Sequence, residues 1–430
     1  MNFLRWLYPG LGLKRWILVI IFGLFCAAEG LAVAQGSELI SLLERPLLKI
    51  VLGLTGDTFR IAAGTSIVIA GVAVMGLGFR QLMRNVLTGL FPGTGSRWGE
   101  KLLLQHQLKK GPKIVAIGGG TGLSALLRGL KEVTSNIVAI VAVTDDGGSS
   151  GRLRGDLGVL PPGDIRNCLV ALADRESAIE RLFNYRFSQG SELAGHSLGN
   201  LLLAGLTQVT GDFSAAVQEV SRILAVKGQV LPVTLEDTVL KGEMEDGRIV
   251  TGETSMVADS CRIKRVFLDP AHCTPLTEAI EAILAADAVI LGPGSLYTSV
   301  IPNLLVPGIG QAIRASKAKV YYICNIMTQP GETDGFYASH HVQAILDHCG
   351  PGLIDKVIVN NEEISPKLKA KYLAQGAEPV QADFAHLKEL KVDVIQHPLS
   401  AQNDLARHDP QKIVQVLLEE IPGNLASLFK

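Results

Sequence analysis

The sequence predicts an α/β protein with a doubly wound, mostly parallel sheet, a small β-rich insertion, and an N-terminal transmembrane helical hairpin. Three observations support this prediction. From Lys113 onward, short apolar runs alternate with helical patterns, as in parallel sheets that are covered on both faces. Residues 230–268 interrupt this alternation with short strand-like runs. Residues 61–79 form a charge-free apolar run.

Composition narrows the classes of protein further. With 47% hydrophobic and only 5% aromatic residues, and 46 glycines in 430 residues, the chain is typical of α/β proteins. A formal net charge of -1 gives no general attraction for nucleic acid, so we predict no nucleic-acid partner. The six cysteines are scattered, which argues against a disulfide framework or a zinc site and favours a reducing compartment.

Residues 1–80 are predicted to form a membrane anchor with helices at about 16–34 and 61–79. At 1.5 Å per residue, the second run spans about 28 Å, which matches the hydrocarbon core of a bilayer. A buried helix of a soluble protein is the alternative for this run. The first run is interrupted by Glu29 and has two interpretations: a first transmembrane helix, or a signal peptide that ends at residues 32–34.

Basic residues predict the orientation of the hairpin. Lys and Arg lie before the first run and after the second, and those of the intervening loop are diluted by Glu38, Glu44 and Asp57, which favours a cytoplasmic location for both ends. Residues 81–112 are expected to form a juxtamembrane linker. We therefore predict a plasma-membrane protein whose main domain, residues 113–425, faces the cytoplasm.

The expected elements of this domain follow from local patterns. Strand candidates are short apolar runs bounded by Gly, Asn or Asp, at 113–117, 137–143, 287–291, 319–324 and 355–359. Helical periodicity indicates helices near 121–132, 164–173, 176–186, 198–209, 212–226, 275–285, 338–348, 365–374 and 410–420. Within 230–268, the pair Asp246-Gly247 is a hairpin turn signal, so we interpret this segment as a β-rich insertion beside the sheet.

The first expected strand ends in a glycine loop that leads directly into a helix. Glycines let the backbone approach a ligand, and the helix N-terminus directs N–H groups toward an anion. The loop is neither a Walker loop nor a complete dinucleotide fingerprint, and a plain tight turn is the alternative. The candidate ligand-binding residues are Gly119, Gly120, Thr121 and Gly122.

The second expected strand ends in the polar segment 144–152. Its adjacent carboxylates can hold Mg²⁺ or accept hydrogen bonds from sugar hydroxyls, and its arginine suits a phosphate. A solvated loop with surface charges is the alternative. We expect no required cofactor and no resident metal, with Asp145 as the candidate ligand if Mg²⁺ binds. The candidate binding residues are Asp145, Asp146, Ser149, Ser150 and Arg152.

Two further polar segments begin expected helices. Asp164 can cap the helix near 164–173, with Arg166 and Asn167 facing the same cleft. Residues 195–199 match Gly-x-Ser-x-Gly, but no strand precedes the serine as the hydrolase motif requires. We interpret this segment as a helix start, with His196 and Asn200 near the cleft.

A third glycine loop follows the expected strand at 287–291. Gly292, Gly294 and Ser295 are candidate residues for an anion or a sugar, with a plain turn as the alternative. Residues 325–333 follow the next strand and are expected to line the same edge of the sheet. The predicted site therefore joins loops from several neighbouring strands.

Together these motifs resemble the gluconeogenesis factor family, also called YvcK-like or GlmR-like proteins. The similarity covers about 113–420 and rests on motifs in the same order: KIVAIGGGTGLSALLRGLK, TDDGGSSGRLR, PPGDIRNCLVALAD, GHSLGNLLLAGL, GPGSLYTSVIPNLL, NIMTQPGETDGF and VNNEEIS. The family belongs to a superfamily with CofD, the 2-phospho-L-lactate transferase. The resemblance implies a Rossmann-like fold. The N-terminal hairpin is not part of the basic soluble pattern, so this chain resembles a membrane-tethered version.

The resemblance also implies a function and two further site residues. It implies binding of UDP-N-acetylglucosamine and a regulatory role in cell-wall precursor supply and cell shape under gluconeogenic growth. It assigns Tyr372 and Arg407 to UDP-sugar binding, although their local sequence alone indicates surface residues. A tyrosine ring can stack on uracil, and an arginine can pair with the pyrophosphate.

Two function classes follow. The favoured one is a non-catalytic UDP-sugar-binding regulator at the bacterial inner membrane, with a cell-wall precursor enzyme as a candidate partner and self-association left open. The alternative is a CofD-like, Mg²⁺-dependent transferase of a phospholactyl-type group from a nucleotide diphosphate donor. No catalytic residue is assigned.

Overall fold

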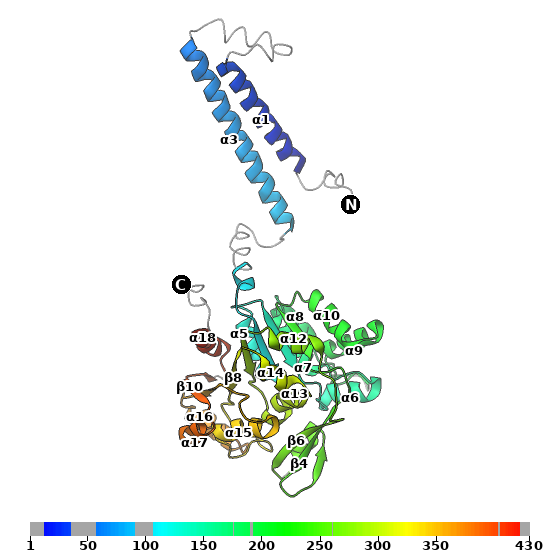
Figure 1. Cartoon of the computed structure of the whole chain (residues 1–430). Coiled ribbons are helices and arrows are strands. Elements are labelled where there is room, and N and C mark those ends of the chain that lie inside the picture. Colours follow the sequence, from blue (N-terminus) through cyan, green and yellow to red (C-terminus); the bar gives the residue numbers. More distant parts are fainter. Residues whose placement is uncertain are drawn as a thin grey trace. The chain divides into compact units, whose positions relative to one another are not determined.

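The computed structural model describes residues 13–35, 57–90 and 106–421, except residues 175, 190, 191, 260, 403 and 404. These residues form two compact units: a pair of N-terminal helices, and a larger α/β unit that begins near residue 106 (Figure 1). Most of the expected linker, 91–105, and the expected domain end, 422–425, lie outside the described residues.

The N-terminal unit is an antiparallel pair of long helices, α1 (Leu13–Gln35) and α3 (Asp57–Leu90). The two backbones approach so closely that a Cβ added at Gly71 would lie 2.6 Å from the backbone nitrogen of Ala27. Both helices are long and apolar enough to cross a bilayer. Each helix is longer than predicted. A helix in the first apolar run is consistent with both interpretations of that run, a transmembrane helix or a signal peptide.

The larger unit contains the predicted doubly wound sheet, with seven parallel strands in the order β10-β9-β8-β7-β1-β2-β3. All the predicted strands are present. The prediction missed the two edge strands and placed residues 230–232 in the insertion, whereas they belong to β3. The strands are β1 (Ile114–Gly118), β2 (Ile137–Val141), β3 (Gln229–Pro232), β7 (Ala288–Leu291), β8 (Lys319–Ile323), β9 (Lys356–Asn360) and β10 (Asp393–His397).

Helices cover both faces of this sheet, because successive strand residues point to opposite sides. On one side, Ile114 and Ala116 of β1 pack with α5 (Gly120–Leu130), α7 (Gly163–Leu172), α10 (Phe213–Ile223) and α18 (Pro410–Glu420). On the other side, Val115 and Ile117 pack with α12 (Thr277–Leu284), α13 (Ile301–Leu305), α14 (Ile309–Ala315) and α15 (Ala338–Cys349). This double layer leaves the carboxyl ends of the strands as the edge on which loops gather.

The remaining helices lie near that edge. Residues 148–152 of the polar segment 144–152, which we expected to be a loop, belong to the helix α6 (Gly148–Leu157). A single π-helical turn, η4 (Leu296–Val300), follows the third glycine loop. The others are α8 (Glu176–Phe183), α9 (Leu198–Thr210), α11 (Glu253–Ala258), α16 (Pro366–Leu373) and α17 (Phe384–Glu389).

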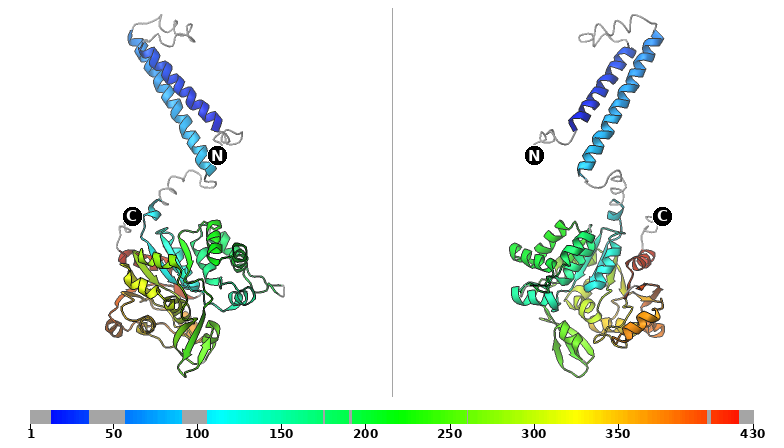
Figure 2. Two further views of the ribbon diagram at one scale, coloured as in Figure 1. Left: turned by 45° about the vertical axis from the view of Figure 1, so that its right-hand side comes forward. Right: turned by 180° about the vertical axis from the view of Figure 1, so that it is seen from behind.

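The predicted β-rich insertion is confirmed as a small antiparallel sheet in the order β5-β4-β6. It contains β4 (Val239–Met244), β5 (Ile249–Thr251) and β6 (Ile263–Asp269), with the predicted hairpin turn between the first two. The sheet projects from the larger unit (Figure 2), while α11, which follows β5, returns toward the main sheet. A second pair, β11 (Ser400–Gln402) and β12 (Ala406–His408), precedes α18.

Candidate functional site

A cavity of about 950 Å³ lies at the carboxyl ends of the central strands. Its walls include residues 119–122 after β1, 293–299 after β7 and 325–332 after β8. The chain leaves β1 toward β2 on one side and returns to β7 on the other, so β1 marks the point where the strand order reverses. In open α/β sheets, ligands bind at such a point.

The first glycine loop forms the centre of this cavity. Helix α5 begins at Gly120, whose φ of +65° is readily adopted only by glycine. A Cβ added at Gly122 would lie 2.5 Å from the carbonyl oxygen of Pro293, so the first and third glycine loops pack backbone against backbone. This contact leaves the start of α5 in the cavity wall. The Gly120 N–H there hydrogen-bonds the Asp164 carboxyl group, and the N–H groups that follow can meet an anion.

Arg166 of α7 is a buried cation in the cavity wall, with only 6% of its surface exposed. Its guanidinium donates to Ser197 Oγ at 2.5 Å, to Asn200 Oδ1 at 3.0 Å and to Asn167 Oδ1 at 2.7 Å. Its Nε has no hydrogen-bond partner among the described residues. Burial, followed by repulsion from Arg186, lowers the pKa of Arg166 to about 10, so it stays charged at neutral pH.

Carboxyl groups gather at the same end of the cavity. Burial, reinforced by the nearby Asp145, raises the pKa of Asp164 to about 6. Burial and three neighbouring carboxylates, Asp145 first, raise the pKa of Glu253 to about 8. Glu332 accepts hydrogen bonds from the backbone nitrogens of Tyr297, at 2.7 Å, and Thr298, at 3.2 Å. Burial nevertheless raises its pKa to about 7.

The Glu332 contacts bear on the third glycine loop. We expected this loop to suit an anion or a sugar. Its N–H groups do face a carboxylate, but that carboxylate belongs to the chain itself. Gly294 and Ser295 line the cavity, whereas Gly292 does not. Ser295 Oγ accepts a hydrogen bond from Gln329 Nε2 at 2.9 Å, which joins the loops after β7 and β8.

Residues of the polar segment 144–152 lie behind the cavity wall. Asp146 accepts hydrogen bonds from the backbone nitrogen of Thr254, at 3.0 Å, and from its hydroxyl, at 2.8 Å, and so caps α11. Ser149 contacts His196 Nδ1 at 3.0 Å and accepts from Asn200 at 3.1 Å. The predicted candidates that do not line the cavity are Asp145, Asp146, Ser149, Ser150, Arg152, His196, Asn200 and Gly292.

The Gly-x-Ser-x-Gly segment is a helix start, as its sequence context predicted. Ser197 is the N-cap residue of α9, and its hydroxyl accepts from the backbone nitrogen of Asn200. The same hydroxyl accepts from Arg166, so Ser197 positions that arginine. Ser197 therefore has two structural partners, the Arg166 guanidinium and the backbone nitrogen of Asn200.

Tyr372 and Arg407 line the other end of the cavity. The Tyr372 ring packs on a small apolar cluster that includes Ile326 and Leu368, and its hydroxyl accepts from the backbone nitrogen of Ala406 at 3.2 Å. This hydrogen bond ties α16 to β12, the strand that carries Arg407. Tyr372 and Arg407 therefore lie in one wall although neither has a local sequence signal.

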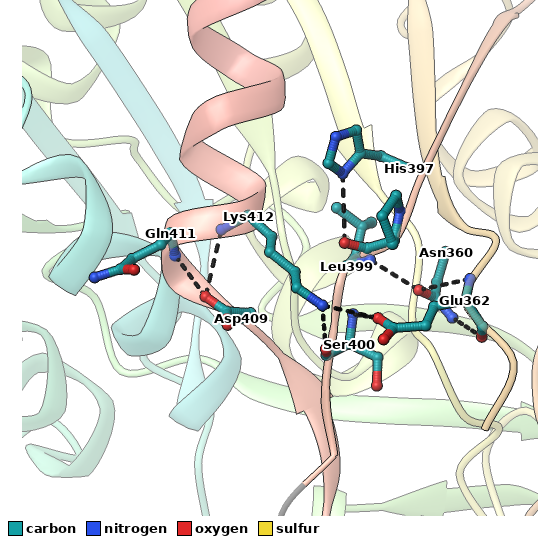
Figure 3. Close-up of polar contacts among 9 residues, drawn as sticks. Asn360, Glu362, His397, Leu399, Ser400, Asp409, Gln411 and Lys412 are labelled. Carbon is teal, nitrogen blue, oxygen red and sulfur yellow. Dashed lines mark hydrogen bonds and ion pairs between the residues drawn. The ribbon is translucent and has the colours of Figure 1, made fainter. Parts of the chain in front are cut away.

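A polar network holds β12 in place (Figure 3). Lys412 Nζ donates to Glu362 Oε2 at 2.9 Å and to the Ser400 carbonyl at 2.8 Å. Asn360 Oδ1 accepts from the backbone nitrogen of Leu399 at 2.9 Å. The Asn-Asn-Glu-Glu segment after β9 thus fixes the β11–β12 pair against the start of α18, which explains the position of Arg407.

The cavity brings together much of the predicted site. The predicted candidates that line it are Gly119, Gly120, Thr121, Gly122, Arg166, Asn167, Gly294, Ser295, Tyr372 and Arg407. The predicted segment 325–333 also contributes. Sequence reasoning missed Arg128, Arg186, Glu253 and His408, which also line the cavity. Arg128 follows the glycine loop on α5, a cue that helical spacing offers, but Glu253 has no comparable cue.

Within the described part of the chain, no group of three or more His, Cys, Asp and Glu side chains is arranged to hold a metal ion. Asp145 Oδ1 accepts from the backbone nitrogen of Gly147 at 2.8 Å. The Mg²⁺ role of Asp145 stays a prediction.

These features define a doubly wound α/β protein with a polar cavity at the strand-order reversal. Residues 114–400 match the family model described as 2-phospho-L-lactate transferase CofD, and the chain belongs to this family. It is 54% identical to the gluconeogenesis factor of Halalkalibacterium halodurans over 320 residues, which are 74% of this chain and 99% of that protein. It is 52% identical to the gluconeogenesis factor of Bacillus subtilis over 309 residues, 72% of this chain and 98% of that protein.

A solved structure supports the fold. The crystal structure of a UPF0052 family protein from Bacillus halodurans is similar with a TM-score of 0.70 and 54% identity, covering 72% of this chain and 99% of that chain. A relative from Nostoc sp. is 44% identical over 424 residues, 97% of this chain and 92% of that protein. The relatives thus differ: the Nostoc alignment includes the N-terminal region, whereas the two shorter relatives match only the larger unit.

Proposed function

We propose that this protein is a UDP-sugar-binding regulator, with UDP-N-acetylglucosamine as its ligand. It links carbon metabolism to cell-wall precursor supply and cell shape under gluconeogenic growth. The names of the relatives and the family motifs support this role. The proposal requires no cofactor.

One observation carries the proposal: a single cavity is lined by the α5 start, Arg166, Tyr372 and Arg407. The helix start and the two arginines match a pyrophosphate, because N–H groups and guanidinium groups both donate to phosphate oxygens. The half-buried Tyr372 ring offers a flat apolar face to uracil. A ligand with an aromatic base joined to a diphosphate satisfies all four features.

Calorimetric titration of the full chain in detergent with UDP-N-acetylglucosamine tests the proposal. Base–aromatic stacking contributes about 1–3 kcal/mol, so Tyr372→Ala should weaken binding about 10- to 100-fold. Tyr372→Phe should bind nearly as well as wild type, because it keeps the ring. Arg407→Ala should also weaken binding, whereas Arg265→Ala, which removes an exposed arginine outside the cavity, should not. Unchanged affinity in both Tyr372→Ala and Arg407→Ala would contradict the proposed site.

A second candidate function is transfer chemistry of the CofD type. The family match and the carboxyl groups beside the glycine loop favour it. Incubation with a nucleoside diphosphate donor that carries a lactyl group on its terminal phosphate, a deazaflavin acceptor and Mg²⁺ discriminates between the two functions. Transfer of the phospholactyl group to the deazaflavin, with release of the nucleoside monophosphate, would replace the regulator proposal with a transferase.

We also propose that the hairpin spans the bacterial inner membrane, with the larger unit in the cytoplasm. Gly23, Gly30, Gly64 and Gly71 lie between the helices while large apolar side chains point outward, an arrangement suited to lipid. Arg80 and Arg84 near the end of α3 favour a cytoplasmic location for that end. A reporter fused after Lys430 that works only in the cytoplasm should be active, and activity of a periplasm-specific reporter would contradict this orientation.

A further inference from the structure

We infer that the sugar end of the bound nucleotide sugar lies against Glu253 of α11, and that this side chain sets the preference of the protein for a UDP-sugar over UDP. The inference rests on the proposed function and extends it, because it assigns the two ends of the ligand to the two ends of the cavity.

The order of strands fixes the direction of the ligand. Tyr372 packs on Ile326, which follows β8, the glycine loop 119–122 follows β1, and Asp145 follows β2. From β8 to β1 is two strand spacings, which is about 10 Å at about 4.8 Å per strand. With uracil on Tyr372 and the diphosphate at the start of α5, the sugar continues toward the β2 side. Glu253 lies on that side, within electrostatic range of Asp145 and Asp164.

The insertion delivers Glu253 to this position and holds it there. Glu253 is the first residue of α11, the short helix that follows β5. Asp146, after β2, binds the backbone and hydroxyl of Thr254 at the N-terminus of this helix. On the far side, Gly331 packs its backbone against the carbonyl of Val257, so the loop after β8 also supports the helix. The small sheet thus supplies one wall of the cavity.

The surroundings of Glu253 favour its uncharged form. The groups that face it are Asp145 after β2, Asp164 on α7, Glu332 after β8, and the Thr298 hydroxyl on η4. No cation is among these groups, and burial together with the carboxylates raises the pKa of Glu253 to about 8.

An uncharged carboxyl group donates through its O–H and accepts through its carbonyl, so it can bind a sugar hydroxyl or an acetamido group. It also avoids the repulsion that an ionised carboxylate would exert on the nearby phosphates. Binding of the UDP-sugar should therefore weaken above about pH 8, as Glu253 ionises. Binding of UDP, which lacks the sugar, should depend less on this group.

The test compares affinities for UDP-N-acetylglucosamine and UDP in the full chain by calorimetry. Loss of a neutral hydrogen bond costs about 0.5–1.5 kcal/mol. Glu253→Ala should therefore reduce the preference for UDP-N-acetylglucosamine over UDP about 3- to 10-fold. Its affinity for UDP should stay at the wild-type value, which also shows that the variant is folded. Glu253→Gln should keep the preference and lose the decline above about pH 8. The control is Glu245→Gln, an exposed residue between β4 and β5 in the same insertion.

The outcomes separate this inference from the proposed function. If wild type prefers the UDP-sugar and Glu253→Ala keeps the full preference, the assignment of the sugar to Glu253 is wrong while the binding proposal stands. If wild type binds neither compound, the proposed function fails and the inference fails with it. A decline above pH 8 that persists in Glu253→Gln would overturn the role of its proton.

Discussion

The two units of this chain place glycine and large apolar side chains in opposite positions. In the α/β unit, Ile117 and Leu126 are fully buried, and glycines form turns and loops around the cavity. In the helical hairpin, Leu18 and Ile69 each expose 65% of their surface, while glycines such as Gly71 lie between the helices. Burial of apolar surface drives folding in water but gives no such drive in lipid, where close packing of small residues joins helices. The comparison supports the proposal that the hairpin lies in lipid.

The largest effect should come from placing a charge on the outer surface of the hairpin. Lysine near the centre of a transmembrane helix costs about 2.5–3.5 kcal/mol, so Ile69→Lys should sharply reduce the fraction of chains whose second helix inserts into microsomal membranes. The matched change in the α/β unit is Val209→Lys on α9, where the side chain is 82% exposed. It should alter neither insertion nor stability. Equal insertion of Ile69→Lys and wild type would show that this surface does not face lipid.

A slightly smaller effect should come from a larger side chain at the contact between the helices, which would push the helices apart. A Cβ at Gly71 would meet backbone atoms of both Gly23 and Ala27, which cannot move aside without separating the helices. Overpacking typically costs about 1–3 kcal/mol, and Gly71→Ile should fall near the upper end of that range. Spin labels at the exposed positions Leu18 and Leu77 should then report a longer and broader distance distribution in detergent.

Gly76 on the same helix provides the control for this prediction. A Cβ added there meets no atom within 4 Å, so Gly76→Ile should leave the distance distribution unchanged. A similar change in both variants would mean that loss of a glycine, rather than loss of the contact, disturbs the hairpin.

The sequence predicted the elements that are buried on both faces, because those strands are nearly continuous apolar runs. It missed β10 because this edge strand is partly exposed and has only two apolar residues in Asp393–His397, too few for a continuous apolar run. It also missed α6, whose glycines, serines and aspartate are weak helix formers. Ser149 and Arg152 of that helix are held instead by contacts with segments distant in the sequence.

In the site, as in the fold, the sequence predicted the parts that depend on neighbouring residues and missed the parts that depend on contacts distant in the sequence. The glycine loop and Arg166 were predictable, because a strand, a turn and a helix start lie within a few residues of each other. Glu253 was not, because its position depends on how the insertion folds back against Asp146. Tyr372 and Arg407 were assigned only through the resemblance, since the hydrogen bond that ties α16 to β12 joins two segments without a shared pattern.

The smallest expected effect concerns a carboxyl group that the α/β unit buries, although burial of its charged form destabilises the folded state. Burial raises the pKa of Glu332 from 4.5 to about 7. The folded state therefore binds more protons than the unfolded state between these values. The free energy of unfolding should be highest below about pH 4.5 and should fall as the pH rises through about 7.

Glu332→Gln removes this titration, while its amide oxygen can still accept from the backbone of Tyr297 and Thr298. Between about pH 5.5 and 7.5, wild type should lose about 1–2 kcal/mol more stability than the variant, measured by urea unfolding of the full chain in detergent. The exposed Glu278→Gln should follow wild type. Some slope should remain in Glu332→Gln, because Asp164 and Glu253 also have raised pKa values. Parallel curves for wild type and Glu332→Gln would mean that its two backbone hydrogen bonds fully compensate for the burial of the charge.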